Sequence, residues 1–250
     1  MNNNLSKNTH NYSKAQIQKS FDFSDNYDYY CKKNVMKSLT IPYIKSLNEA
    51  NIDSVAAILE EFGQRDTIEA VNWQNTYPYK PITLFNIARS ESSIFVKFNV
   101  RGNLLKAVYS TDQSPVHEDS CVEFFCKLPN NEFYTNFEFN CIGTCSASKR
   151  KSRTENVIPF DKDEMLTIKR APSIGKRAFN EMQGIFEWEL TVEIPFQLIG
   201  LNPQQLPAKL HANFYKCADK TDSPHFVSWN PISTEKPDFH RPEFFGELLF

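Results

Sequence analysis

The sequence has only seven glycines among its 250 residues, against 14 prolines. This ratio favours turns fixed by proline over turns that need the positive φ angles of glycine. No run approaches the roughly 20 apolar residues of a membrane-spanning helix, so no membrane partner is predicted. The first 16 residues, MNNNLSKNTHNYSKAQ, contain no apolar stretch of the kind found in secretory signals. The expected location is therefore cytoplasmic.

An excess of either charge is also missing. The chain has 28 basic and 30 acidic residues, which give a net charge of −2. Such a balance provides no long-range field that would attract nucleic acid, and no nucleic-acid partner is predicted. The phosphate-loop, dinucleotide-binding, nucleophile-elbow and HExxH zinc-protease motifs are all absent from the sequence, which argues against several common enzyme classes.

The cysteines show no metal-binding spacing. None of them forms a C-x-x-C pair, and the closest two are four residues apart; the six are Cys31, Cys121, Cys126, Cys141, Cys145 and Cys217. Free thiols that fill core space are the favoured interpretation. A zinc site made of Cys141, Cys145 and Cys217 is the alternative, but it lacks the usual ligand spacing, so no metal ligand is assigned.

Aromatic residues, in contrast, are abundant. They make up 14% of the chain, with 21 Phe and 10 Tyr, and such side chains favour β-strands. Apolar and polar residues alternate with period 2 in several segments, which is typical of strands with one apolar face. Strands are predicted around 81–89, 94–100, 122–125, 137–141, 186–194 and 212–215. Many short strands with little helix predict an all-β fold, an antiparallel two-sheet β-sandwich.

The chain divides into an extension and one domain. Residues 1–35 are polar without hydrophobic periodicity, and predict a disordered extension that can be removed without unfolding the rest. The domain is expected to span residues 36–250. Within it, helical spacing of apolar residues predicts one short helix over 51–62, ended by Gly63. Long loops are expected at 103–119, 146–163 and 219–244, where binding residues usually lie on a sheet scaffold.

Three segments carry information beyond the fold class. They are HEDSCVEFF at 117–125, YTNFEFNCIGT at 134–144, and a tail with NFY at 213–215, SWNP at 228–231, PDFHRP at 237–242 and FG at 245–246. In this order and spacing they resemble the family 9 carbohydrate-binding modules over roughly residues 70–250. The resemblance implies a non-catalytic β-sandwich that binds a sugar end between two aromatic side chains.

The same resemblance implies particular site residues. The two clamp positions, which are tryptophan in the family, fall at His117 and Phe239, and the sheet positions facing the sugar fall at Glu123, Glu138, Asn140 and Tyr215. Strand parity independently places Glu123, Glu138 and Asn140 away from the apolar faces of their strands. Further candidates are Asn213, Trp229 and Arg241. For Trp229 the favoured alternative is an aromatic residue wedged into the core, and for Arg241 it is an ion pair that pins the C-terminal tail. The resemblance also implies structural calcium.

The expected function is therefore weak, non-catalytic saccharide binding in a shallow groove between the 103–119 and 230–244 loops. Three alternatives stay open: a glycoside hydrolase that uses Glu123 and Glu138, a haem-binding sandwich with His117 as axial ligand, and a protein-interaction scaffold. As a loop-tip residue, Phe239 is expected to contribute little to stability.

Overall fold

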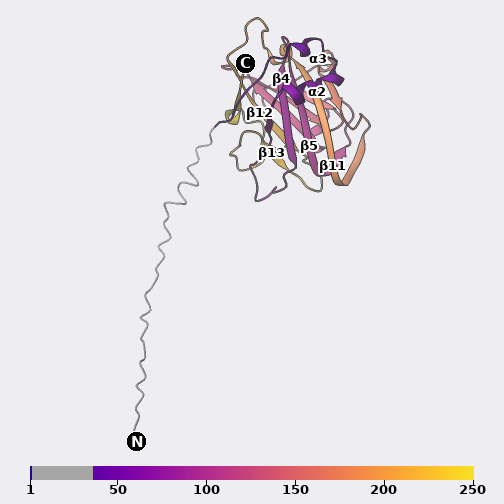
Figure 1. Cartoon of the computed structure of the whole chain (residues 1–250), viewed down its shortest axis with the longest axis vertical. Helices are drawn as coiled ribbons and strands as arrows, with labels where there is room; N and C mark the ends of the chain where they lie inside the picture. Colours follow the sequence, from indigo (N-terminus) through magenta and orange to yellow (C-terminus); the bar gives the residue numbers. More distant parts are fainter. Residues whose placement is uncertain (2–35) are drawn as a thin grey trace. The chain divides into compact units, whose positions relative to one another are not determined.

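The structure is a computed structural model that describes Met1 and residues 36–250. The predicted extension lies, apart from Met1, outside the described residues. Residues 36–250 cluster as one compact unit, and Figure 1 shows that its strands are arranged in two layers. The all-β sandwich predicted from the sequence is confirmed.

The first layer is a nine-stranded sheet in which most neighbours are antiparallel. A short N-terminal strand is the exception, because β1 pairs with β14 in parallel. The main path runs β1 (Ser38–Thr40), β14 (Gly246–Leu249), β12 (Lys209–Cys217), β6 (Cys121–Lys127), β7 (Tyr134–Asn140), β8 (Cys145–Arg150) and β9 (Ile158–Pro159), and β13 (Phe226–Ser228) joins β12 to β3 (Ala70–Val71).

The second layer is a five-stranded antiparallel sheet. Its order is β10 (Lys169–Pro172), β11 (Phe179–Pro195), β5 (Ser93–Ala107), β4 (Ile82–Arg89) and β2 (Gln64–Thr67). The helical segments of the described chain are short: α2 (Ile52–Phe62), α3 (Lys162–Thr167), α4 (Phe196–Ile199) and the 3-10 turns η1 (Lys45–Asn48), η2 (Val116–Glu118) and η3 (Pro242–Phe244). None of these is long and apolar enough to cross a membrane.

Stacked aromatic rings fill the space between the sheets. Phe214 of β12 lies between Phe85 of β4, at 4.0 Å between ring centroids, and Phe124 of β6, at 5.0 Å. All three are fully buried, as the alternation in their strands requires. This inter-sheet core fixes which face of β6, β7 and β12 points outward.

The outward face of the nine-stranded sheet is also covered, which the alternation alone did not indicate. An outer aromatic cluster on this face includes Trp73, Phe125, Tyr134, Tyr215 and Phe239. The C-terminal loop supplies Phe239 and thereby covers much of the face. Charged residues on the outward face of β6 and β7 are consequently buried, and not solvated as in an ordinary outer sheet face.

The predicted helix is present as α2. The side chain of Asn51 caps its first turn, and the Gly63 N–H donates to the Leu59 carbonyl at its end. Its buried residues Val55 and Leu59 pack on the outer face of the five-stranded sheet, and Figure 1 shows α2 lying over β4, β5 and β11.

All three predicted loops need correction. The segment 219–244 contains β13 and the 3-10 turn η3. Strand β5 continues to Ala107, so the connection to β6 is shorter than 103–119, and the segment 146–163 contains most of β8 as well as β9 and the start of α3. Strand β8 was missed because only the small residues Cys145 and Ala147 face its core side. Helix α3 was missed because it is only six residues long, although Asp161 and Glu164 form a capping box at its start.

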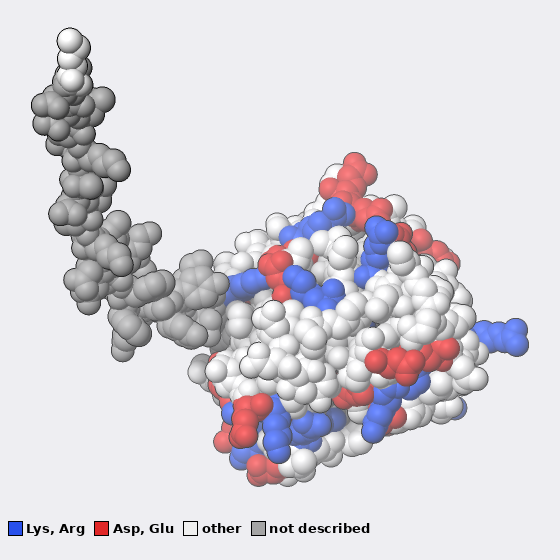
Figure 2. Space-filling view, turned by 90° about the horizontal axis from the view of Figure 1, so that it is seen from below, with Lys and Arg blue, Asp and Glu red and all other residues white. Residues whose placement is uncertain are grey.

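Figure 2 shows acidic and basic side chains interspersed over the visible face of the molecule, without a continuous basic surface. Ion pairs such as Lys209–Glu247 and Arg101–Glu187 account for part of this mixing. The distribution agrees with the near-zero net charge, and the absence of a nucleic-acid partner stays a prediction.

Candidate functional site

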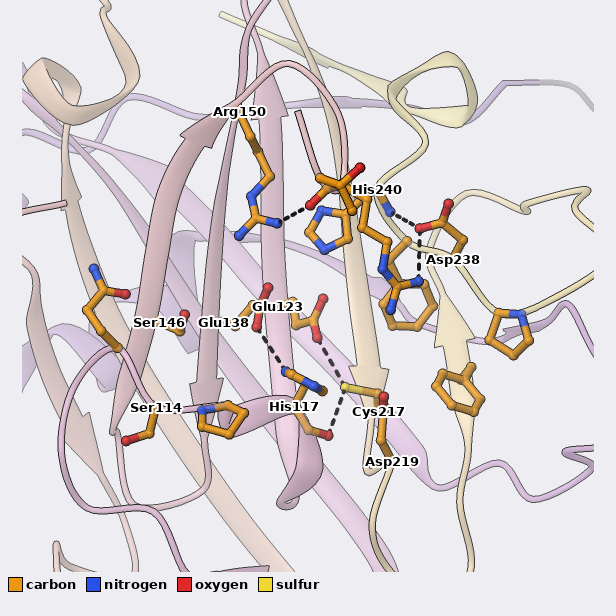
Figure 3. A pocket seen from close by; sticks show the side chains of 17 residues that line it. Ser114, His117, Glu123, Glu138, Ser146, Arg150, Cys217, Asp219, Asp238 and His240 are labelled. Carbon is orange, nitrogen blue, oxygen red and sulfur yellow. Dashed lines mark hydrogen bonds and ion pairs between the residues drawn. The ribbon is translucent and has the colours of Figure 1, made fainter. Parts of the chain in front are cut away.

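A cavity of about 400 Å³ opens on the outward face of the nine-stranded sheet. Its floor comes from β6, β7 and β12. Three segments form its walls: 113–117 before and within η2, 150–154 from the last residue of β8 onward, and 237–240 in the C-terminal segment. Figure 3 shows Glu123, Glu138, His117, Cys217 and Asp219 converging on it. The structure thus places a polar cavity between the two loops that the sequence predicted, and adds a third loop to its wall.

Glu123 and Glu138 lie directly opposite each other on β6 and β7, as the predicted face requires. Both are almost completely buried, with 2% and 6% of their surface exposed. Glu138 is held by a chain of hydrogen bonds that runs across the sheet. Arg150 Nε donates to Ser148 Oγ, which donates to Asn136 Oδ1, and Asn136 Nδ2 donates to Glu138 Oε1 at 3.0 Å. This chain fixes the carboxylate before any ligand arrives.

The two carboxyl groups differ in protonation. Burial raises the pKa of Glu123 well above its usual range, and the negative charge of Glu138 raises it further. Burial also opposes ionisation of Glu138, but His117, whose Nδ1 lies 3.6 Å away, acts together with the neighbouring basic side chains His240 and Arg150 to outweigh burial, so the pKa of Glu138 is lowered. The same interaction raises the pKa of His117. The cavity floor therefore pairs a carboxyl group that favours its protonated form, which can donate, with one that favours its ionised form, which can accept.

The third wall contains two arginines, Arg150 and Arg153, from a basic cluster in the sequence that also includes Lys149 and Lys151. Arg150 Nη1 donates to the Arg153 carbonyl, and Arg153 Nη1 lies 3.6 Å from Asp238 Oδ1 in the C-terminal loop. This contact links the two loops at the cavity edge. Beside it, burial lowers the pKa of His240 to about 4, and His240 Nδ1 pairs with Tyr134 Oη at 2.9 Å.

Phe239 lines the cavity as predicted, but it is a core residue and not a loop tip. Only 8% of its surface is exposed, and its ring stacks on Tyr215 with centroids 4.2 Å apart and planes 10° apart. Tyr215 lies behind Phe239, and its hydroxyl donates to the Phe239 carbonyl. The prediction that Tyr215 forms part of the floor is therefore wrong in position, and Phe226 provides the second aromatic side chain of the wall.

Asn140 is likewise placed behind the cavity surface. Its Nδ2 donates to the Tyr109 carbonyl and to Asp119 Oδ2, and its Oδ1 accepts from the Thr144 N–H. Asp119 in turn accepts from the backbone N–H groups of Val108 and Tyr109. Both polar atoms of Asn140 form hydrogen bonds within the protein, to the segments around Tyr109 and Thr144. Asn140 therefore does not form part of the cavity floor to which the sequence assigned it.

The three further candidates also have other roles. Asn213 is fully buried and exchanges hydrogen bonds with the backbone of Asn230. Trp229 is fully buried between the sheets, and its indole N–H donates to Asp66, as the core-wedge alternative requires. Arg241 pairs with Glu243 at 2.7 Å, as the tail-pinning alternative requires. None of the three lines the cavity.

Several cavity residues were not among the sequence candidates, namely Arg150, Arg153, Cys217, Asp219, Asp238 and His240. Cys217 could have been found, because it lies two positions after Tyr215 in β12 and so shares its face. The basic cluster pointed to the arginines. Asp238 and His240 could have been suspected as cavity residues only because they are next to the predicted clamp residue Phe239 in the sequence.

Neither the implied calcium nor a haem finds a matching cluster of His, Cys, Asp or Glu side chains among the residues described. Among them, the one group of at least three His, Cys, Asp or Glu side chains close enough to share an ion is Cys121, Glu123 and Cys217. Calcium requires a shell of oxygen ligands, which two thiols do not provide. The cavity walls carry Glu, Asp, Arg and His side chains, which do not suit the apolar face of a haem.

Comparison with known proteins gives the family. The model of carbohydrate-binding family 9 matches residues 54–250. A proposed carbohydrate-binding protein from Bacteroides uniformis, known from its crystal structure, is 33% identical with a TM-score of 0.79, and the match covers 86% of this chain and 99% of that chain. No curated protein matches the chain.

A family 9 module from Caldicellulosiruptor kristjanssonii in complex with glucose matches at 10% identity with a TM-score of 0.53, over 85% of this chain and 95% of that one. At this identity the likeness shows the β-sandwich fold alone. By the match over residues 54–250, the chain belongs to carbohydrate-binding family 9. The family expected from the sequence motifs is confirmed.

The buried His240 predicts acid sensitivity. Its folded pKa of about 4 lies below the ordinary 6.5, so the unfolded chain binds a proton at mildly acidic pH that the folded chain rejects. Stability from this group is present above pH 6.5 and is lost as the pH falls toward 4. Relative to His240→Asn, the wild type should lose about 2 kcal/mol between pH 7 and pH 5.

Urea unfolding of both proteins at the two pH values measures this loss. An NMR titration of the His240 ring provides the independent check. A ring that titrates near 6.5, or equal losses in both proteins, would contradict the buried neutral imidazole.

Proposed function

We propose that the cavity binds one end of a saccharide, without catalysis. The observation that carries this proposal is the pair Glu123 and Glu138, a carboxylic acid beside a carboxylate at the foot of a wall formed by Phe226 and Phe239. Sugar hydroxyls both donate and accept hydrogen bonds, while the C–H face of the ring packs on aromatic surface. Membership of carbohydrate-binding family 9 supports the same class of ligand.

The size of the cavity limits the ligand. A volume of about 400 Å³ lies at the small end of ligand pockets, which suits a terminal sugar unit better than the middle of a chain. Phe226 and Phe239 offer less stacking surface than tryptophan, so the affinity should be weak, about millimolar or −4 kcal/mol. A glycan array followed by calorimetry on the best sugar tests the proposal.

Replacing the ionised acceptor should weaken binding strongly. Glu138→Gln removes the negative charge while preserving the shape of the side chain, and hydrogen bonds to charged groups contribute about 1.5–3 kcal/mol. The expected loss of affinity is at least about tenfold. The matched control is Glu187→Gln in the other sheet, where the side chain is 71% exposed. Equal affinity in the two variants would place the sugar elsewhere.

A glycoside hydrolase is the second candidate, because the two pKa shifts separate an acid from a base. Glu123, however, is 2% exposed, and its Oε1 accepts from Cys217 Sγ at 3.1 Å. One carboxyl oxygen is thus engaged with the thiol, and general acid catalysis would require the other oxygen to reach a glycosidic oxygen. Nitrophenyl glycosides distinguish the candidates: release of nitrophenol that is lost in Glu123→Gln would favour hydrolysis over binding.

A further inference from the structure

Two cysteines lie side by side at the base of the cavity. Cys121 of β6 and Cys217 of β12 are direct cross-strand partners on the outward face of the nine-stranded sheet. Glu123, two residues after Cys121, points to the same face. Its Oε1 lies 3.1 Å from Cys217 Sγ and 3.9 Å from Cys121 Sγ. The sheet therefore holds two thiols and a carboxyl group together without help from any loop.

We propose that Cys121, Cys217 and Glu123 bind a thiophilic divalent cation, with zinc as the physiological candidate. Zinc takes thiolate and carboxylate ligands at about 2.3 Å and 2.0–2.2 Å, so ligand atoms of a tetrahedral site are about 3.5–3.8 Å apart. The three ligand atoms here all lie within 4.8 Å of one another, and the two distances to Glu123 bracket the required range. Small rotations of the side chains complete the geometry.

The fourth ligand position would face the cavity. Cys217 and Glu123 both line it, so an ion can enter from solvent, and a water can occupy the open position. Asp219 lies two residues after Cys217 and also lines the cavity. Its Oδ1 is buried and has no hydrogen-bond partner within the described part of the chain. A metal-bound water is a donor that would satisfy this orphaned oxygen.

Binding of the cation must be balanced by the release of protons from its ligands. Burial raises the pKa of Cys121 to about 12, so the thiols keep their protons until an ion arrives. Each S–H, and the protonated carboxyl group of Glu123, then loses its proton to solvent as its bond to the metal forms. The charged groups around the thiols are Glu138 on β7, His117 on η2, Lys216 on β12 and Asp219 in the turn that follows β12. Two carboxylates among them favour a cation.

The inference goes beyond sugar binding, and its test uses the ion alone. The full chain, reduced and freed of metal, is titrated with Co²⁺, which reports thiolate ligation by charge-transfer absorption, and the cobalt is then displaced by Zn²⁺. One equivalent should saturate the protein. Cys121→Ala and Cys217→Ala should each weaken binding at least a hundredfold, while Glu123→Gln weakens it at least tenfold and keeps the thiolate absorption.

The matched control is Cys126→Ala, since Cys126 is on the same strand but faces the inter-sheet core. It should bind cobalt as the wild type does. Circular dichroism checks that each variant folds, and X-ray absorption of the zinc-loaded wild type, which needs no variant, should show two sulfur ligands with oxygen completing the shell. The proposal is overturned if the reduced protein binds no stoichiometric ion, if Cys217→Ala binds as tightly as Cys126→Ala, or if the ion has no sulfur ligand.

Discussion

Phe239→Ala should lower the free energy of unfolding by about 3 kcal/mol, a fall of roughly 6–12 °C in Tm for a domain of this size. The ring is 8% exposed, stacks on Tyr215, and contacts Trp73 and Phe226 at centroid distances of 6.2 and 6.0 Å. Truncation leaves a hole in the outer aromatic cluster that rigid neighbouring rings cannot fill. It also removes part of the cavity wall, so sugar binding should weaken as well.

Guanidinium unfolding compares this variant with Phe62→Ala. Phe62 ends α2 and is 58% exposed, so its truncation should change the free energy of unfolding by no more than about 0.5 kcal/mol. A loss below about 1 kcal/mol in Phe239→Ala would restore the loop-tip role expected from sequence and contradict the packing seen here. Measuring stability before affinity matters, because a partly unfolded variant would appear as a non-binder.

Much of the sandwich could be predicted because period-2 alternation is a local property. Segments such as 186–194 carry large apolar residues at every second position, and they form β11 as expected. The burial of the outward face could not be predicted in this way. It depends on Phe239 and Phe245 from the C-terminal loop, which reach β6 and β7 across more than 100 residues of sequence.

In the candidate site, too, some residues could be predicted from the sequence and others could not. Glu123 and Glu138 were predictable as neighbours, since strand parity and the short connection between β6 and β7 fix their pairing. Asn140 and Tyr215 share that parity but end up behind the surface, because hydrogen bonds to Tyr109 and Phe239 hold them there. Parity gives the face of a residue and says nothing about what covers it.

The family motifs themselves prove to be mostly structural. Asp119 and Ser120 accept hydrogen bonds from backbone N–H groups between Lys106 and Tyr109. Ser228, Asn230 and Asn213 form a network around Trp229. Within the segment 117–125, only His117 and Glu123 line the cavity. The motifs therefore identify the fold more firmly than they identify the ligand.

Gly246 shows how such a motif acts through packing. A Cβ atom at this position would lie 2.5 Å from Trp229 Cζ3 and 2.7 Å from the Lys37 carbonyl oxygen. Both neighbours are fixed: the indole is fully buried with its N–H bonded to Asp66, and Lys37 precedes β1, which pairs with β14. Gly246→Ala should therefore destabilise the domain by about 3 kcal/mol through overpacking alone.

A double variant separates the two contacts. Trp229→Phe removes the ring atoms nearest to position 246, so Gly246→Ala should cost at least about 1 kcal/mol less in that background. Gly175→Ala is the control for glycine replacement as such: nothing lies within 4 Å of its Cβ position, and its φ of +81° predicts a cost of only about 1 kcal/mol. If the cost of Gly246→Ala is the same with Trp229 and with Phe at that position, the indole is not the obstacle, and the approach of β14 to the Lys37 backbone explains the glycine.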